Sequence, residues 1–175
     1  MKLVKEHLII DISKMTIEQL IKISPLEIQE IFEKSKIIPQ TLIYHPEKWI
    51  YDHIKIVFNR AKRTNDINLI LAAYFHDMGK IFTTIKHATI PNKWSAHGHE
   101  KISSRLVLKY KDWIESLGGD YNIIYYIVDQ HMRAKQLSNM RQAKQQIFRS
   151  HPHFDLLQQF TEFDNMLKDY SDDLD

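Results

Sequence analysis

The chain has 175 residues, 43% of them hydrophobic and 26% charged, which is long enough for one domain with a sizeable core. It has no cysteine, so disulfide bonds and thiolate metal ligands are excluded, and any metal ion must be held by nitrogen and oxygen atoms. The net charge of +2 is too small to predict bulk binding of nucleic acid, although a local basic patch is compatible with it. The N-terminus has no long apolar run and no stretch is long enough to span a membrane, so we expect a cytoplasmic protein with no membrane partner.

The first third of the chain predicts short helices. Glycine and proline are few, and apolar residues recur with a period near 3.6, which favours an all-α fold. Residues 1–12 are expected to form a short strand or a frayed helix. Thr16 is the expected N-cap of a helix that ends before Pro25, and Pro25 is the expected first residue of the next helix. A similar His-Pro-Glu signal predicts a helix over about residues 46–63.

The stretch from Ile67 to Phe75 is apolar on nearly every helical face, which predicts a helix over residues 67–78 that is buried on all sides. Its end carries His76 and Asp77, side chains that a buried helix does not tolerate without a partner. A bound metal ion is the simplest partner. Gly79 is expected to let the backbone turn away, and Lys80 places a cation where a phosphate group can sit.

The second half of the chain predicts a long loop followed by helices. The loop runs over residues 82–98, contains several basic residues and is long enough to suggest a functional role. Helices are expected in four later ranges, 99–117, 121–132, 138–149 and 154–170. The first of these is stopped by the Gly118-Gly119 pair, and the last is followed by a frayed tail.

Helical phase separates candidate ligands from surface residues, because residues three, four or seven apart share a face. His53, His99 and His131 each share a face with apolar neighbours and are therefore expected to point inward. Asp164 borders the apolar stripe of the last predicted helix. Asp129 is turned about 200° away from His131, so a regular helix cannot present both to one site.

Together these residues give six candidate metal ligands: His53, His76, Asp77, His99, His131 and Asp164. Imidazole and carboxylate ligands without sulfur suit Mn, Fe, Co, Ni or Zn ions, and Mg is a further candidate. Six ligands are too many for one catalytic ion with an open position, but they suit two divalent ions that share an aspartate. His76 and Asp77 lie about 100° apart round the helix, so His76 can serve one ion while Asp77 bridges both.

The order of these residues resembles the H…HD…H…H…D pattern of HD-domain metal-dependent phosphohydrolases. Several strings are similar to the HD domain of bacterial CCA-adding tRNA nucleotidyltransferases: Asp52-His53-Ile54, the run from Ala72 to Lys80, Gly98-His99-Glu100, and Val128 to Met132. The likeness covers roughly residues 45–168 and does not include a nucleotidyltransferase domain. It implies an all-α bundle, residues 45–175, with the metal site between central helices. We expect residues 1–44 to be a helical extension packed on this core.

The resemblance also implies a function. It implies that metal-activated hydroxide cleaves a phosphomonoester or phosphodiester of a nucleotide or short, including cyclic, oligonucleotide, so that the partner is a small phosphorylated substrate. His76, Asp77 and Lys80 are the expected catalytic residues, and Lys80, His97 and Arg133 are the expected substrate contacts. One alternative is a single-metal deoxynucleotide phosphohydrolase, in which Asp129 would be the last ligand. The other is a non-catalytic module that binds or senses nucleotides.

Overall fold

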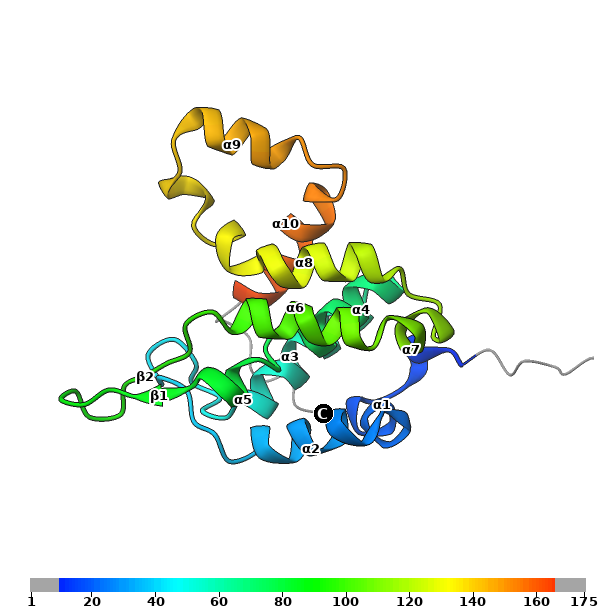
Figure 1. The fold of residues 1–175 in the computed structure, drawn as a ribbon, viewed down its shortest axis with the longest axis horizontal. Helices are drawn as coiled ribbons and strands as arrows, with labels where there is room; N and C mark the ends of the chain where they lie inside the picture. Colours follow the sequence, from blue (N-terminus) through cyan, green and yellow to red (C-terminus); the bar gives the residue numbers. More distant parts are fainter. Residues whose placement is uncertain (1–9, 166–175) are drawn as a thin grey trace, which may run out of the picture.

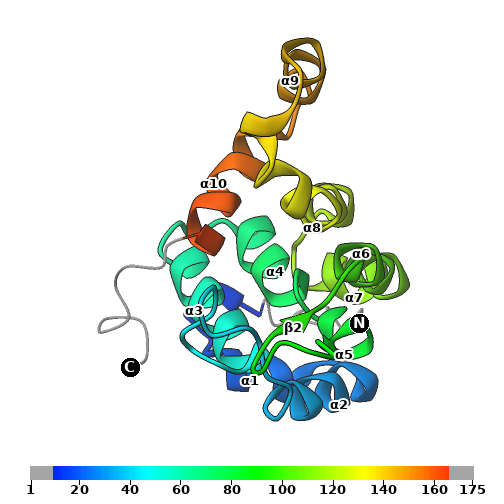
Figure 2. The same cartoon turned by 90° about the vertical axis from the view of Figure 1, so that its left-hand side faces the viewer.

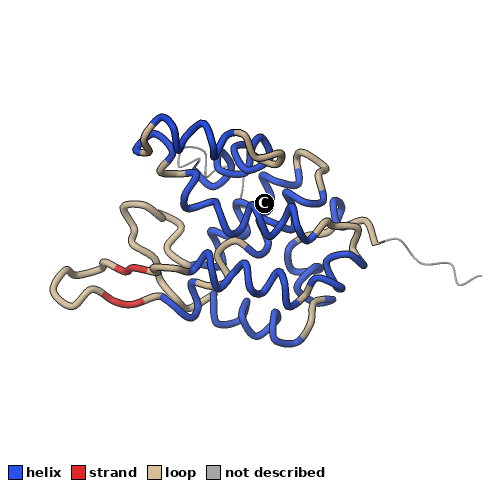
Figure 3. The backbone as a smooth tube through the Cα atoms, turned by 45° about the horizontal axis from the view of Figure 1, so that its top comes forward, coloured by secondary structure: helices blue, strands red, loops and turns tan. Residues whose placement is uncertain are grey.

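The computed structural model describes residues 10–165, and this part of the chain is mostly helical, with a short two-stranded hairpin (Figures 1 and 3). The predicted all-α class is therefore confirmed. In chain order the helices are α1 (Ile17–Ile23), α2 (Leu26–Ser35), α3 (Ile50–Lys62), α4 (Ile67–Phe75), α5 (Lys80–Thr83), α6 (His99–Lys109), α7 (Lys111–Ser116), α8 (Tyr121–Ala134), α9 (Gln142–Arg149) and α10 (Phe154–Asn165). Short 3₁₀ turns at Ile12–Lys14 and Leu137–Asn139 precede α1 and α9.

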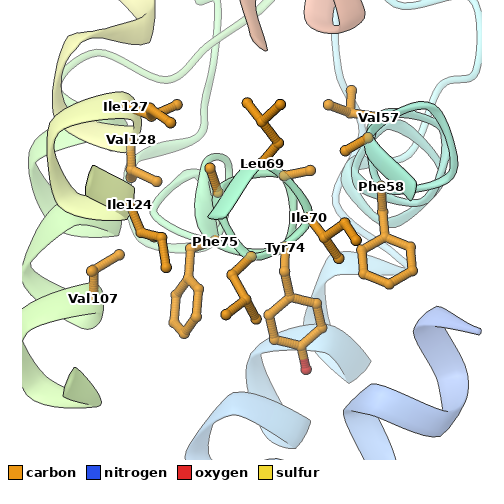
Figure 4. Packing of buried hydrophobic residues seen from close by; sticks show 14 of the residues in the cluster. Val57, Phe58, Leu69, Ile70, Tyr74, Phe75, Val107, Ile124, Ile127 and Val128 are labelled. Atoms are coloured by element: carbon orange, nitrogen blue, oxygen red, sulfur yellow. The ribbon is translucent and has the colours of Figure 1, made fainter. Parts of the chain in front are cut away.

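Helix α4 lies at the centre of the fold (Figure 2). It packs between α3 and α8, and α6 and α10 also contact it. Every side chain from Leu69 to Phe75 is fully buried. In Figure 4, Ile70 lies toward Phe58 of α3, Phe75 lies on the side of Ile124 of α8, and Tyr74 points toward the N-terminal helices. The prediction of a helix buried on all sides is confirmed, and each large apolar side chain contributes about 1.5–3 kcal/mol through burial.

The two N-terminal helices pack against the same core. Thr16 caps α1 as predicted, and its capping box is completed by Gln19. Ser24, at the end of α1, shares a hydrogen bond of 2.7 Å with the hydroxyl of Tyr74 and so ties this region to α4. Pro25 is the N-cap residue of α2 rather than its first helical residue. The description of residues 1–44 as an extension separate from the main domain stays a prediction.

Helix α3 begins at Ile50, not at residue 46, so the predicted start was wrong by about one turn. Lys48 has a left-handed backbone with φ 71°, which interrupts any helix there. Trp49 is extended and forms an isolated bridge with Pro39. This turn places Glu47 beside α3 instead of within it, and that position matters for the site.

The long loop that was predicted over residues 82–98 contains a hairpin. Its strands β1 (Ile85–Lys86) and β2 (Trp94–Ser95) pair antiparallel, and the hairpin projects from the body in Figure 3. Thr41 binds both the backbone N–H and the carbonyl oxygen of Trp94, at 2.8 Å each, and so fixes the hairpin on the segment before α3.

Two predicted helices differ from the observed ones. The helix expected over residues 99–117 is divided into α6 and α7 at Tyr110, whose backbone leaves the helical region with φ −108° and ψ 23°. Its predicted stop is confirmed, since Gly118 adopts φ 87°. The helix expected over residues 138–149 is shorter, because a 3₁₀ turn occupies its first residues.

The predictions for most of residues 1–12, for the end of the last helix and for the frayed tail lie outside the described residues. Within residues 10–165, none of the helices combines the length and the hydropathy that crossing a membrane requires.

Candidate metal centre

Six side chains from five parts of the fold meet next to the C-terminal end of α4. α3 carries His53, and the turn that follows α4 carries the adjacent His76 and Asp77. The first residue of α6 is His99, the last turn of α8 contains His131, and α10 contributes Asp164. All six side chains are buried, with at most 7% of any residue exposed. The structure therefore brings together all six residues that the sequence proposed as metal ligands.

Gly79 makes this convergence sterically feasible. Its φ of −63° is accessible to any residue, so the expectation that Gly79 was needed for an unusual backbone turn was wrong. A Cβ atom at this position would instead clash with the carbonyl oxygen of His99. The absence of a side chain lets the start of α6 approach the end of α4, and Ser103 fixes that approach by accepting a hydrogen bond from the Gly79 N–H at 2.8 Å.

All four imidazole rings are oriented by a hydrogen bond at Nδ1. His76, His99 and His131 donate to the carbonyl oxygens of Ala73, Ala96 and Val128, each three residues earlier, at 2.7–2.8 Å. The fourth ring, His53, has its Nδ1 2.7 Å from Glu47 Oε1. A carbonyl oxygen only accepts, so in the neutral ring the proton is on Nδ1 and Nε2 carries a lone pair. This arrangement is typical of histidines that ligate metal ions through Nε2.

The donor atoms form two groups of three whose members all lie within 4.8 Å of one another. The deep triad consists of His53, His76 and Asp164, and the cavity triad consists of Asp77, His99 and His131. In the deep triad, Asp164 Oδ1 is 3.0 Å from His53 Nε2 and 4.0 Å from His76 Nε2. In the cavity triad, Asp77 Oδ1 is 3.0 Å from His99 Nε2 and 3.9 Å from His131 Nε2.

The Asp77 carboxylate lies between the two triads. Its Oδ1 contacts the cavity triad, whereas its Oδ2 is 3.4 Å from both His53 Nε2 and His76 Nε2 of the deep triad. Ligands about 2.1 Å from a common ion stand about 3.0–3.4 Å apart at right or tetrahedral angles. The spacings of Asp77 from His53, His76 and His99 lie in this range, whereas those of 3.9 Å to His131 and of 4.0 Å between Asp164 and His76 are longer.

Two features of the cluster are energetically unfavourable without a cation. His76 Nε2 is buried without a hydrogen-bond partner in the described part of the chain. The Nε2 atoms of His99 and His131 face each other at 3.3 Å, although both rings carry their proton on Nδ1. Burial lowers the pKa of His131 to about 3, despite the nearby charge of Asp164, so this ring stays neutral. Two opposed lone pairs repel, and a cation between them would remove the repulsion. The donor set therefore fits divalent metal ions.

Both aspartates remain ionised in spite of their burial. Desolvation raises the pKa of Asp77, but the electrostatic effect of the adjacent His76 and of the Lys80 ammonium group outweighs it and holds this pKa well below its usual range. For Asp164 the opposing charge is that of Lys135, supported by the hydrogen bond with His53. The Nζ atoms of Lys80 and Lys135 lie 2.6 Å and 2.7 Å from the Oδ2 atoms of Asp77 and Asp164.

His53 differs from His131. Burial lowers its pKa, but the hydrogen bonds with Asp164 and Glu47 outweigh burial, and the net effect is a raised pKa. The same Glu47 oxygen is also 3.0 Å from His45 Nδ1.

A cavity of about 340 Å³ opens onto this cluster. It reaches Asp77 and His99 at its floor, and its wall includes the two lysines, the aromatic rings of Tyr44 and Trp94, and exposed His97 at the rim. Its volume is at the lower end of the range for small-molecule sites, about 300–1,000 Å³.

The structure places the other predicted site residues in different surroundings. Lys80, for which contact with phosphate stays a prediction, lines the cavity and donates to Gln40 Oε1 at 2.6 Å. Arg133 does not line the cavity and lies over the ring of Phe148, at 4.6 Å from its centroid. Asp129 is buried away from the cluster and accepts hydrogen bonds from Lys101 and Ser104.

The sequence prediction missed several residues that the site uses, among them Lys135 and Glu47. Lys135 is four residues after His131 and therefore lies on the same face of α8, so helical phase was a signal that could have found it. Glu47 reaches His53 through a turn with a left-handed residue, and helical spacing gives no signal for that contact.

One of the comparisons with known proteins gives a match. The family model for the HD domain matches residues 48–152 of the chain. This match contains five of the six clustered residues and ends before Asp164. No curated protein and no solved structure matches the chain.

Proposed function

The chain belongs to the HD-domain family, whose members are in general metal-dependent phosphohydrolases, and from this premise we propose that it hydrolyses a phosphate ester of a nucleotide or short, including cyclic, oligonucleotide. One observation carries the proposal. Four oriented imidazole Nε2 atoms and two ionised aspartates converge in a buried cluster, and Asp77 and His99 of this cluster line a cavity whose wall bears two lysines. Such a set binds cations on one side and an anionic substrate on the other.

The proposed ligands are the two triads. His53, His76 and Asp164 would hold one divalent ion, and His99 and His131 would hold the other, with Asp77 shared between them. The hydrogen bonds that hold Asp129 on Lys101 and Ser104 favour Asp164 over Asp129 as the last ligand. Divalent ions so held supply an activated water nucleophile and neutralise charge on the phosphoryl oxygens.

The protein side chains then account for substrate binding. Lys80 and Lys135 place two ammonium groups beside the floor of the cavity, where they attract the phosphoryl oxygens. Gln40 holds Lys80 in position through its side-chain oxygen. In the reaction, the oxygen of water bonds to phosphorus and its released proton passes to solvent, while the ester P–O bond breaks and the leaving oxygen takes a proton from water or from His97 at the rim.

The size and lining of the cavity support a nucleotide unit as the group that enters. About 340 Å³ leaves no room for a folded nucleic acid, and the rings of Tyr44 and Trp94 offer flat apolar surfaces to a base. The likeness of the sequence strings to CCA-adding enzymes adds to this proposal without fixing a tRNA substrate, since the likeness does not extend to a nucleotidyltransferase domain.

The test is metal analysis followed by a substrate screen. Purified protein is expected to contain divalent metal, to hydrolyse mononucleotides, cyclic nucleotides or short oligonucleotides with Mn²⁺, and to lose activity after chelation. An Asp129→Asn variant serves as the matched control for Asp164→Asn, because both carboxylates are buried and paired with a lysine. Binding of nucleotides without hydrolysis by any divalent metal would favour the non-catalytic alternative.

A further inference from the structure

The charge of the chain is unevenly distributed along the segment that follows the metal centre. From residue 130 to residue 154 the chain has no aspartate or glutamate, and it has five lysine and arginine residues there. The whole chain has 22 acidic residues and 24 lysine and arginine residues, so its net charge is small although this segment is basic. Strongly basic surface of this kind is typical of proteins that bind phosphate backbones.

This segment forms a basic arm, defined as residues 136–153, which stands away from the rest of the fold between α8 and α10 (Figures 1 and 2). The arm is anchored by Phe148, a buried residue whose ring packs on that of Phe154 with centroids 5.6 Å apart. Its cations Arg141, Lys144 and Arg149 are exposed. Among residues 10–165, none of these three forms an ion pair.

Some cations elsewhere in the fold are paired with carboxylates. Lys55 pairs with Glu18 at 3.1 Å, and Lys101 pairs with Asp129 at 2.8 Å. Within residues 10–165 the three cations of the arm form no such ion pair, so their field acts on the solvent and on bound anions.

The arm begins directly at the proposed catalytic cavity. Lys135, which lines that cavity and pairs with Asp164, is the residue immediately before it. A strand with one phosphate at the cavity floor would therefore carry its next phosphates over a surface that begins with Lys135 and continues into the arm.

We propose that the basic arm binds the phosphate backbone of a single-stranded oligonucleotide while one of its nucleotides occupies the cavity. This inference rests on the proposed function, because the cavity is taken as the place where the phosphate ester is cut. The strand is single because a cavity of about 340 Å³ with aromatic walls admits one unstacked nucleotide and not a duplex. An anionic membrane is a poorer partner, since α9 has eight residues and one exposed large apolar side chain, Ile147.

The test measures binding of the full chain to fluorescein-labelled 12-nucleotide oligouridylate and oligothymidylate by fluorescence anisotropy. The triple variant R141Q/K144Q/R149Q removes the arm cations, and K22Q/K34Q/K111Q removes three exposed lysines elsewhere as the matched control. We expect at least tenfold weaker binding for the arm variant at low salt. The slope of the logarithm of the binding constant against the logarithm of the salt concentration should become shallower by about 2, because each of the three lost phosphate contacts contributes about 0.7. A conservative R141K/R149K variant should retain the parent affinity. Stronger binding of the uridylate probe would identify RNA as the ligand, and equal binding a generic single strand.

Equal losses in the arm and control variants, or unchanged binding in both, would overturn the inference, as would arm-dependent binding to phosphatidylserine vesicles and not to either oligonucleotide.

Hydrolysis of bis(p-nitrophenyl) phosphate with Mn²⁺ keeps the two proposals distinguishable. Parent and arm variant should cleave this small ester at the same rate. Arm-dependent binding without any hydrolysis by the parent would support the arm as a binding surface and contradict the proposed reaction. Hydrolysis without arm-dependent binding would contradict this inference alone.

Discussion

The deep triad and the cavity triad have similar ligands but different surroundings. His53 and Asp164 of the deep triad are held by charged groups, Glu47 and Lys135, and no member of this triad lines the cavity. In the cavity triad the two histidines donate from Nδ1 to backbone carbonyl oxygens, and Asp77 and His99 line the cavity. The difference suggests that the deep triad retains its ion, whereas the cavity triad presents an ion to the substrate.

The largest expected effect comes from the carboxylate that both triads share. Asp77→Asn should remove the negative charge between the two proposed ions, so that bound metal and hydrolysis both fall. Loss of an outer contact already costs about 10–100-fold, and loss of a shared ligand should cost more than 100-fold. Metal analysis and turnover with Mn²⁺ check this, with circular dichroism to confirm that the helical content is kept. Full activity in this variant would remove the metal hypothesis.

The next effect should separate Asp164 from Asp129. Asp164→Asn deprives the deep triad of its only carboxylate other than the shared one, and we expect at least the 10–100-fold loss of activity typical of disturbed metal sites. Asp129→Asn leaves both triads intact and should stay within a few-fold of the parent. The reverse order at saturating Mn²⁺ would make Asp129 the ligand and favour the single-metal nucleotidase.

The cavity triad can be disabled selectively. His99→Ala or His131→Ala removes one of its two imidazoles and should lower the metal content from about two ions per chain to one, as a two-ion centre requires. The remaining ion should be in the deep triad. An unchanged metal content with weaker substrate binding would show that these histidines are pocket residues and that the two triads are not equivalent sites.

The sequence predicted the fold class and the convergence of the six clustered residues because both depend on local periodicity. The phases of His53, His99 and His131 on regular helices were sufficient to direct them inward. Phase would also have excluded Arg133, two residues after His131, and selected Lys135, four residues after it. The contact between Glu47 and His53 could not be predicted from helical phase. It depends on a left-handed turn at Lys48 and on a bridge between Pro39 and Trp49.

Glu47 provides a smaller and more specific test of the deep triad. Glu47→Gln removes a charge that orients and polarises His53 without removing a proposed ligand. Affinity for the deep ion should fall by about 10–100-fold, whereas the cavity ion should be nearly unaffected. Calorimetric metal titrations of parent and variant measure both sites. Equal weakening of both ions would show that the charge of Glu47 acts on the whole cluster.

The smallest expected effect is a difference in pH dependence. The raised pKa of His53 means that a proton competes with the deep ion as the pH falls through that pKa, so binding there should weaken toward acid and release about one proton. The pKa of His131 is lowered to about 3, so protonation of this ring does not compete at moderately acidic pH. Titrations in buffers of different ionisation enthalpy measure the protons released. Equal proton release at both sites would contradict the distinction between the triads.

The most direct measurement is anomalous X-ray diffraction from crystals of the full chain grown with Mn²⁺. The account predicts two anomalous peaks about 3.5–4 Å apart, as in other two-metal sites. One should be bound by His53, His76 and Asp164, and the other by His99 and His131, with the Asp77 carboxylate between them. A single peak, or two peaks that do not flank Asp77, would contradict it.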